Sequence, residues 1–324
     1  MVSAFITWNA DPVAFHIPIW GREVRWYGIA FVVGFMIGLW IVQKIWKHEQ
    51  LKDDWYDKLF IYVIVATVVG ARLGHILFYG PYFDAIDPQT GGIIEGYFSH
   101  PFNMLKVWEG GLASHGGTLG IIIAIWIYSK TVTHRSMLWT FDRLVVPVGF
   151  VAALIRLGNL MNHEIYGHAT NLPWGFRFIE KIPSWLNGDA PIYSVPSHPT
   201  QLYEAACYIL TSFICLYMYW KRKDYKYEGL IFGVFLIGIF LSRFVVEYFK
   251  NVQESFEEGM VNSIGINMGQ LLSVPFIIAG IWLVYRGLQS KKKAAFEPVV
   301  NENAAKKIIP QASSAKNKPV NKRK

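Results

Sequence analysis

The sequence predicts an all-α integral membrane protein, a bundle of seven transmembrane helices with structured periplasmic loops. Its composition supports this class, because 53% of the residues are hydrophobic and 17% are charged, whereas soluble proteins carry about 25% charged residues. Seven apolar stretches approach the length of about 20 residues that a helix needs to cross a bilayer. Lysine and arginine also concentrate in alternate loops, as they do in multi-pass membrane proteins.

The candidate spans follow one another along the chain, and the third and fourth are the shortest. They are residues 26–46, 58–79, 112–129, 141–159, 203–220, 229–249 and 266–286. Two of the connecting loops, residues 80–111 and 171–200, place prolines, glycines and tryptophans among apolar residues. This composition favours short surface helices or a small cap over flexible loops.

The distribution of basic residues predicts the orientation of the chain. Residues 44–58 contain four lysines, whereas Lys106 is the only lysine or arginine in the loop 80–111. Cytoplasmic loops are rich in Lys and Arg, so the N-terminus is expected outside and the C-terminus in the cytoplasm.

Residues 1–290 should form the seven-helix membrane-embedded domain. Residues 291–324, with ten basic and two acidic residues, should form a disordered cytoplasmic tail; contact of this tail with anionic lipid is the alternative.

Several classes of function find no support in the sequence. Cys207 and Cys215 lie in one apolar span without a CxxC spacing, so neither a zinc site nor a redox pair is indicated. His163 and His168 are five residues apart and do not share a helix face, unlike the histidines of H-E-x-x-H. The chain has no nucleic-acid module and no G-x-S-x-G nucleophile. We therefore expect no metal, no cofactor and no nucleic acid.

Residues 154–167 are the most informative segment. An apolar run, Leu144 to Leu154, leads directly into five polar or charged residues, and helical spacing places Arg156, Asn159 and His163 on one face. A charge at bilayer mid-depth costs about 2.5–3.5 kcal/mol on insertion scales. Such residues need partners, a ligand or water, so this segment is expected to form the floor of a site.

The expected topology brings polar residues of all seven spans to one level near the outer leaflet. In span order they are Arg25 and Tyr27; Arg72; His115; Arg156, Asn159 and Glu164; His198, Gln201, Tyr203 and Glu204; Arg243 and Glu247; Asn267 and Gln270. Arginine offers a bidentate fork to phosphate. The set therefore predicts capture of an anionic phospholipid head group, with the imidazole of His115 as a candidate general base.

Each of these residues also has a purely structural interpretation. Arg243 and Glu247, four residues apart, would pair as structural glue, and Arg72 would brace a loop or snorkel. Tyr27 would anchor the interface, His115 would cap a helix or bind a backbone carbonyl, and Glu204 would favour a helix N-terminus. Taken together, these interpretations leave the excess of arginine on one side unexplained.

Seven sequence blocks, in this order and spacing, resemble the prolipoprotein diacylglyceryl transferases of bacterial membranes. The blocks are residues 25–28 (RWYG), 70–74 (GARLG), 110–117 (GGLASHGG), 156–164 (RLGNLMNHE, followed by Gly167), 198–204 (HPTQLYE), 243–247 (RFVVE) and 268–270 (MGQ). The resemblance runs from about Trp26 to Ser273. Three positions depart from it: Ile155 and Leu160 replace the usual Gly and Phe, and Ile239 replaces a frequent Tyr.

The resemblance implies transfer of the sn-1,2-diacylglyceryl group from phosphatidylglycerol to the lipobox cysteine of a prolipoprotein signal peptide, the first step of lipoprotein maturation. Residues 1–290 would then be the catalytic domain, a multi-pass monomer in the bacterial cytoplasmic (inner) membrane. The expected catalytic residues are His115, Arg156, Asn159, Arg243, Glu247 and Tyr27. The expected substrate-binding residues are Arg156, Arg243, Glu164, Gly167, Arg72 and Glu204.

Two other classes remain as alternatives. A transporter with a buried charged site would be expected to show inverted repeats or interrupted helices in matched positions, and the sequence shows no such repeat. A membrane-embedded protease would need a Ser/His or metal constellation, which the sequence does not contain. The transferase interpretation needs neither, because its nucleophile is the thiol of the substrate.

Overall fold

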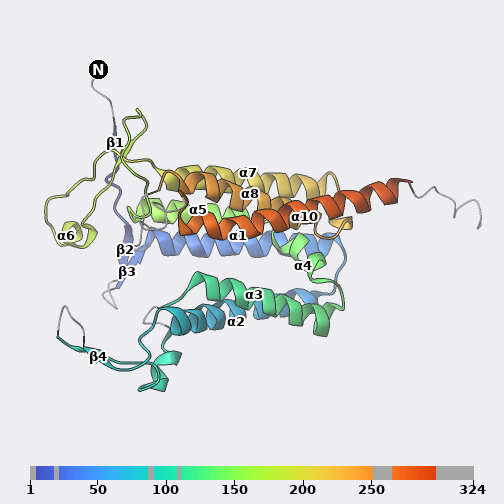
Figure 1. The fold of residues 1–324 in the computed structure, drawn as a ribbon, viewed down its shortest axis with the longest axis horizontal. Coiled ribbons are helices and arrows are strands. Elements are labelled where there is room, and N and C mark those ends of the chain that lie inside the picture. Colours follow the sequence, from blue (N-terminus) through green and yellow to red (C-terminus); the bar gives the residue numbers. More distant parts are fainter. Residues whose placement is uncertain (1–4, 18–21, 87–90, 108–110, 251–264, 297–324) are drawn as a thin grey trace, which may run out of the picture.

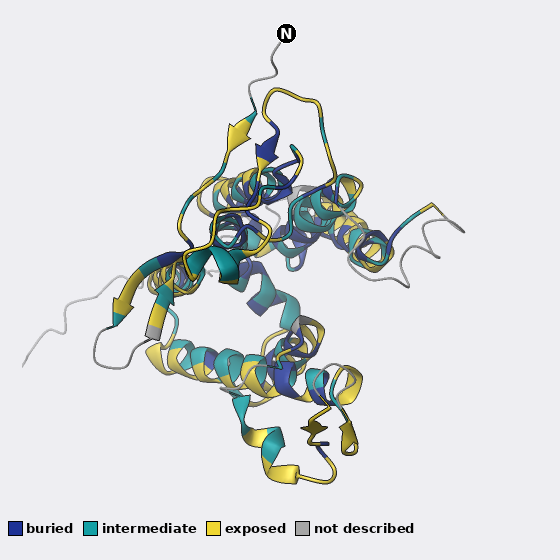
Figure 2. Ribbon diagram, turned by 90° about the vertical axis from the view of Figure 1, so that its left-hand side faces the viewer, coloured by how far each residue is buried: buried dark blue, intermediate teal, exposed yellow. Residues whose placement is uncertain are grey.

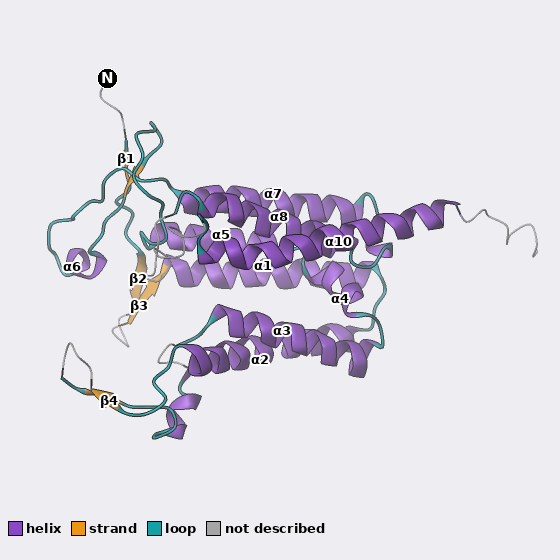
Figure 3. Cartoon of the chain, viewed as in Figure 1, coloured by secondary structure: helices purple, strands orange, loops and turns teal. Residues whose placement is uncertain are grey.

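The computed structural model describes residues 5–17, 22–86, 91–107, 111–250 and 265–296, and most of them are helical (Figure 1, Figure 3). The long helices are α1 (Trp26–His48), α2 (Asp53–Phe78), α3 (Ser114–Tyr128), α7 (Thr200–Trp220), α8 (Leu230–Glu247) and α10 (Met268–Phe296). The π-helical turn η3 (Ser129–Thr133) extends α3. Six helices in the described part of the chain are long and apolar enough to cross a membrane. The helical membrane class is therefore confirmed.

The fourth predicted span, residues 141–159, is divided into two helices. They are α4 (Met137–Leu144) and α5 (Val148–Met161), which are bent by 50° relative to each other. Pro147 lies at the break; it has no N–H for the helical ladder, and its ring disfavours helical geometry in the residue before it. The described residues thus contain six unbroken candidate spans, or seven if the bent pair counts as one.

The helices form two groups, a five-helix bundle and a hairpin (Figure 1, Figure 2). In the bundle, α5 packs between α1 and α7, and α8 packs between α7 and α10, whereas α2 packs mainly on α3. One core near α4 joins the two groups, because the fully buried Ile45 and Tyr219 of the bundle share it with Ile125 and Tyr128 of the hairpin. The hairpin therefore diverges from the bundle toward the opposite end.

That opposite end carries a small cap, defined here as residues 5–17, 22–25 and 162–199. Its strands are β1 (Ile6–Thr7), parallel to β6 (Phe176–Arg177), and β2 (Val13–Ile17), antiparallel to β3 (Arg22–Arg25). It also contains the short helix α6 (Ile182–Leu186). The indole N–H of Trp8 donates to the carbonyl oxygen of Leu160 at 3.0 Å, which ties the cap to the end of α5. The expectation of a structured cap in this loop is confirmed.

The remaining short elements lie at the helix ends. Between α2 and α3 are the hairpin of β4 (Ala85–Ile86) and β5 (Ile93–Ile94) and the 3-10 turn η1 (Pro101–Leu105); between α7 and α8 is η4 (Asp224–Lys226). The expected tail from residue 291 overlaps the last turns of α10, which ends at Phe296. Residues 297–324 lie outside the described part of the chain.

Candidate active site

The turn that follows α5 has an unusual backbone. His163 and Ile165 have φ angles of +57° and +61°, a left-handed conformation that is rare for residues other than glycine and most unusual for a β-branched one. Such residues cost about 1–3 kcal/mol each and persist only where the surroundings impose them. Strained backbone of this kind clusters at functional sites, so the contacts that impose it identify the site.

Four hydrogen bonds hold this turn. Ile179 donates its backbone N–H to Nδ1 of His163 at 3.1 Å, so Nε2 carries the proton and donates to the carbonyl oxygen of Ala10 at 2.9 Å. From the start of α7, the hydroxyl of Thr200 donates to the carbonyl oxygen of Ile165 at 2.9 Å, and the side-chain amide of Gln201 donates to that of Glu164 at 2.7 Å. The cap and α7 together fix the position of Glu164.

Glu164 points back to the last turn of α5. Its Oε1 accepts hydrogen bonds from the amide of Asn159 at 2.8 Å and from that of Asn162 at 3.2 Å. The Oδ1 of Asn159 in turn accepts from Nη1 of Arg156 at 3.3 Å. Arg156, Asn159 and Glu164, all expected at the end of the fourth span, thus form one chain of contacts. This chain orients the guanidinium of Arg156. The prediction that His163 shares the helix face of Arg156 and Asn159 is wrong, because α5 ends at Met161 and His163 contacts the cap.

Glu204 is the centre of a buried charge cluster. Its carboxylate is fully buried in α7 and forms ion pairs with Nε of Arg156 at 2.7 Å and with Nζ of Lys250 at 3.0 Å. The hydroxyl of Tyr208 donates to the same carboxylate at 3.3 Å. Lys250 also contacts Glu247 at 3.1 Å. We define the charge cluster as Arg156, Glu204, Arg243, Glu247 and Lys250.

Arg243 is the unpaired cation of this cluster. It lies on α8, half-buried, one turn before Glu247. Among the residues that the structure describes, none forms a hydrogen bond or ion pair with its guanidinium. The predicted helical pair of Arg243 and Glu247 is therefore not formed, because Lys250 takes the carboxylate. The cluster keeps one net positive charge and can accept an anion.

Tyr27 lies against the same part of α5. A β-carbon built on Gly158 would be 2.8 Å from Cδ2 and 3.0 Å from Cα of Tyr27, so only glycine allows the start of α1 to approach α5 this closely. Gly158 stands between Leu157 and Asn159, and the contact places Tyr27 beside the residues that orient Arg156. The structure therefore brings Tyr27 to the site that the sequence predicted for it.

Gly167 holds the cap against the end of α8. It forms an isolated β-bridge with Lys250, and a β-carbon built on it would be 2.2 Å from the carbonyl oxygen of Phe249. The geometry gives Gly167 a role in placing the backbone of Lys250. The sequence analysis expected Gly167 among the substrate-binding residues, and the close contact that the structure shows is with Phe249 of the chain itself.

Arg72 braces the loop between α2 and α3. Its guanidinium donates to the carbonyl oxygens of Asn103, Met104 and Gly111, and it lies 5.2 Å from the ring centre of Tyr97. These contacts favour the loop-bracing alternative that the sequence left open for Arg72. They are made on the hairpin, outside the charge cluster.

His115 is also on the hairpin, in the first turn of α3, with its side chain exposed. No hydrogen bond or ion pair among the described residues links it to Arg156 or Arg243. The glycine that follows it, Gly116, packs on α2, since a β-carbon there would be 2.2 Å from the carbonyl oxygen of Gly70. The structure thus places Arg156 and Arg243 in the bundle, and it leaves Arg72 and His115 on the neighbouring group of helices.

Two further polar residues of the predicted level, Asn267 and Gln270, form a capping box at the start of α10. The side-chain oxygen of Asn267 accepts from the backbone N–H of Gln270 at 2.9 Å, and that of Gln270 accepts from the N–H of Asn267 at 3.1 Å. The amide of Gln270 also donates to the carbonyl oxygen of Phe244 at 3.2 Å. Both residues anchor α10 to α8.

Lys250 is a site residue that the sequence analysis did not predict, because it lies just beyond the expected end of the sixth span at residue 249. Its spacing was the available signal: it follows Glu247 by three residues, which places the two side chains on one face of a helical turn. The second contact, with Glu204, could not be read from spacing. It depends on how α7 packs against the end of α8.

Burial disfavours the protonated form of two cap histidines beside the site. Removal from water lowers the pKa of His163 below its usual value, although the hydrogen bond to Ala10 opposes the shift. Burial also lowers the pKa of His198, and the neighbouring His168 lowers it further. Nδ1 of His198 lies 3.2 Å from the hydroxyl of Tyr203, which itself accepts from the indole of Trp174. Among the described residues, no group of three or more His, Cys, Asp or Glu could hold a metal.

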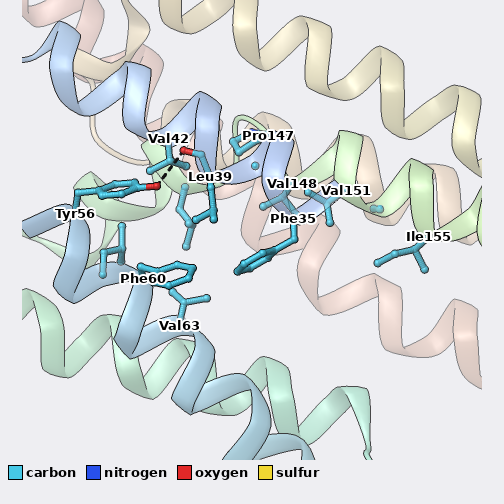
Figure 4. A pocket seen from close by; sticks show the side chains of 14 residues that line it. Phe35, Leu39, Val42, Tyr56, Phe60, Val63, Pro147, Val148, Val151 and Ile155 are labelled. Atoms are coloured by element: carbon cyan, nitrogen blue, oxygen red, sulfur yellow. Dashed lines mark hydrogen bonds between the residues drawn. The ribbon is translucent and has the colours of Figure 1, made fainter. Parts of the chain in front are cut away.

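An apolar groove lies beside the charge cluster, between the bundle and the hairpin (Figure 4). Its volume is about 260 Å³, and nearly all of its lining is hydrophobic side chain from α1, α2, α4 and α5. The rings of Phe35 and Phe60 lie next to each other in it, with their centres 5.7 Å apart, and Ile155 lies at one end (Figure 4). Ile155 precedes Arg156 on α5, so the groove extends to the helical turn that carries Arg156.

Comparison with known proteins identifies the family. The sequence profile of the prolipoprotein diacylglyceryl transferases matches residues 12–286, which include the whole charge cluster. The chain belongs to the prolipoprotein diacylglyceryl transferase family. The transferase resemblance found in the sequence is thereby confirmed.

Curated relatives of the family support the assignment across nearly the full length. A phosphatidylglycerol–prolipoprotein diacylglyceryl transferase of Porphyromonas gingivalis is 51% identical, over 89% of this chain and 96% of its own. Proteins of the same name from Tolumonas auensis and Chloroherpeton thalassium are 42% and 38% identical. The alignments cover 89% and 91% of this chain, and 98% of each relative.

Proposed function

We propose that this protein transfers the sn-1,2-diacylglyceryl group of phosphatidylglycerol to the lipobox cysteine of prolipoproteins. The names of the relatives supply the two substrates. The observation in this chain that carries the proposal is the charge cluster, which holds a half-buried guanidinium without a carboxylate partner among the described residues. A phosphodiester with a single negative charge matches that surplus.

In the proposed reaction, the sulfur of the substrate thiol attacks the C3 carbon of the diacylglycerol moiety. A carbon–sulfur bond forms, the bond from that carbon to the phosphate oxygen breaks, and glycerol phosphate leaves with the bonding electrons. Arg156 and Arg243 bind the phosphate and stabilise the charge that develops on the leaving group. No nucleophile of the protein is required, in keeping with a sequence whose two cysteines both lie in α7.

The thiol must also lose its proton, since a free cysteine has a pKa near 8.5. We assign this step to His115, which approaches the thiol from the hairpin while the arginines hold the lipid on the bundle. The substrates then lie between the two groups of helices, where the groove beside Ile155 accommodates an acyl chain. His115 becomes part of the site only when both substrates are bound.

The other predicted residues support the two arginines. Asn159 and Glu164 orient Arg156, Glu204 fixes its position, and Tyr27 positions lipid or peptide by hydrogen bonding. Glu247 orients the glycerol hydroxyls. Gly167 permits close approach in the site, and Arg72 contributes by shaping the loop that borders it.

We place the site at the outer face of the bacterial cytoplasmic membrane, in a monomer with the N-terminus outside and the C-terminus in the cytoplasm. The alternation of lysine-rich loops supports this orientation. The charge cluster then lies at the level of the outer lipid head groups. Phosphatidylglycerol and a signal peptide could both reach it by lateral diffusion.

The test is a transfer assay with purified protein in mixed micelles that contain phosphatidylglycerol and a lipobox peptide. The expected product is a peptide whose mass increases by one diacylglyceryl group, with equimolar release of glycerol phosphate. A peptide with serine in place of cysteine is the control and should remain unmodified. Failure to modify the cysteine peptide would refute the proposed function.

Arg243→Ala sharpens this test. The variant should lose transfer activity, because the phosphate loses the cation that the cluster leaves free. Its melting temperature should stay near that of the wild type, because no ion pair among the described residues is broken. Retained activity would remove Arg243 from the mechanism.

A further inference from the structure

Lys250 occupies a position that decides which cation of the cluster is free. It follows the C-terminus of α8, its side chain is 4% exposed, and its Nζ lies 3.0 Å from Glu204 and 3.1 Å from Glu247. Its backbone is fixed on both sides, by the bridge to Gly167 and by donation of its N–H to the carbonyl oxygen of Glu247 at 3.2 Å. Such a residue has little freedom to bind substrate itself.

The two carboxylates of the cluster are satisfied without Arg243. Glu204 is paired with Arg156 and Lys250, and Glu247 with Lys250. Without the ammonium of Lys250, Glu247 would be a partly buried carboxylate four residues after Arg243 on the same helix. Opposite charges at this spacing attract each other, and an unpaired buried carboxylate is costly. Arg243 would then turn to Glu247, and the cluster would lose its surplus positive charge.

We propose that Lys250 is a positioning residue, which holds the carboxylate of Glu247 away from Arg243 and so keeps that guanidinium available for the phosphate of the lipid substrate. This inference rests on the proposed function. Lys250 would thus act on the reaction indirectly, through the position of Arg243, without contacting the reacting atoms. It also explains why a helical pair that the spacing favours is not formed.

The experiment compares the KM for phosphatidylglycerol in five proteins: wild type, Lys250→Arg, Lys250→Met, Glu247→Gln and the double variant Lys250→Met/Glu247→Gln. Transfer to the lipobox peptide is measured at varied mole fractions of phosphatidylglycerol in neutral detergent micelles. Lys250→Met should raise this KM about tenfold or more, the size of effect expected from one lost charge-assisted hydrogen bond. Its kcat at saturating lipid should fall less. Lys250→Arg should remain within about threefold of the wild type, since the charge is kept.

The double variant separates positioning from general destabilisation. Glu247→Gln removes the carboxylate that competes for Arg243, so the double variant should recover a KM close to that of Glu247→Gln alone. A merely structural role of Lys250 would instead appear as a loss of stability in Lys250→Met, because Glu247 is left unpaired, while the KM for phosphatidylglycerol of the folded fraction stays unchanged. The single and double variants are compared at equal amounts of folded protein, judged by melting curves.

The outcomes distinguish the two proposals. If the wild type transfers no lipid, the proposed function fails and the role of Lys250 fails with it. If the wild type is active but the double variant keeps the high KM of Lys250→Met, only the role of Lys250 is overturned. A fall in kcat with an unchanged KM for phosphatidylglycerol in Lys250→Met would overturn it as well. Should Lys250→Met not accumulate, the same comparison holds between Glu247→Gln and the double variant, whose KM values should agree within about twofold.

Discussion

The two ends of the helical bundle both bury charged residues, but they complete the pairing differently. At the end near α4, Arg143 lies between Trp139 and Glu49, and the hydroxyl of Tyr219 donates to the same carboxylate. Each described cation there that is buried has a carboxylate within 3.0 Å. At the cap end, Arg156 and Lys250 are paired in the same way, whereas Arg243 is not.

Carboxylates near α4 also have structural partners. Asp142 accepts from the backbone N–H groups of Gly229 at 2.6 Å and Phe232 at 2.8 Å, so it caps the start of α8 from outside the helix. Asp224 is paired with Arg222 at 2.8 Å and with Lys291 of α10 at 2.6 Å. This end uses its charges to fix helix termini and to hold the broken span in place.

The difference teaches how a buried charge can be assigned to stability or to function. Burying an ion is costly unless a partner compensates it. Where every buried charge has a partner of opposite charge, as Arg143 has in Glu49 near α4, stability alone accounts for the pair. A half-buried cation without a carboxylate partner can still bind an anion. Among the described residues at these two ends, Arg243 at the cap end is such a cation. The comparison makes predictions for substitutions at both ends.

The largest effect on stability is expected for Arg143→Met. Removing one partner of a buried ion pair costs about 3–5 kcal/mol, and Arg143 also loses its contact with Trp139. The melting temperature should therefore fall clearly, while the folded fraction keeps the KM for phosphatidylglycerol. Arg243→Ala is the matched variant at the cap end, with the opposite result: loss of transfer and little change in melting temperature. If both variants showed the same loss of stability, the two ends would not differ as described.

An intermediate effect is expected for Gly158→Ala. The added methyl group would overlap Cδ2 and Cα of Tyr27, so α1 must shift from α5 beside Asn159. A misplacement of about 1 Å in a site costs roughly a hundredfold in rate, and we expect a loss of tenfold to a hundredfold in kcat/KM, measured in the transfer assay. The control is Gly28→Ala, on the next residue after Tyr27, where a β-carbon meets no atom within 4 Å. An equal loss in both variants would contradict this explanation.

The smallest effect concerns the pH dependence of stability, and it belongs to the cap. Burial lowers the pKa of His163 and His198, so the folded cap takes up a proton at these positions less readily than an unfolded histidine, which does so near pH 6.5. Their contribution to stability is complete above about pH 6.5 and is lost as the pH falls below it, because the unfolded state binds more protons. Melting temperatures at pH 7.5 and 5.5 measure this loss.

His163→Gln provides the comparison for this measurement. The variant removes one of the two groups and should show a smaller decrease in melting temperature between pH 7.5 and 5.5. An unchanged decrease would mean that His163 does not contribute through its protonation. A melting temperature that rose on acidification would contradict the assigned direction of both pKa shifts.

Much of the fold could be predicted because hydropathy and the positions of prolines depend on short stretches of sequence. The apolar length of α1, α2 and α7 follows from hydropathy alone, and Pro147 marks the break between α4 and α5 in the sequence itself, although the continuous pattern of residues 141–159 concealed it. The choice between the two roles of Arg72 was not local. It depended on where the carbonyl groups of residues 103–111 would lie.

The sequence by itself determined the membrane class, the family and the residue types of the site, because hydropathy, motif order and spacing are written along one chain. It also placed Arg156, Asn159 and Glu164 together, since the three lie within one helix end and the following turn. Only the tertiary structure decided which charges meet. The pairing of Glu204 with Lys250 joins α7 to the end of α8, and ion pairing depends on distances of a few ångströms that no sequence separation specifies.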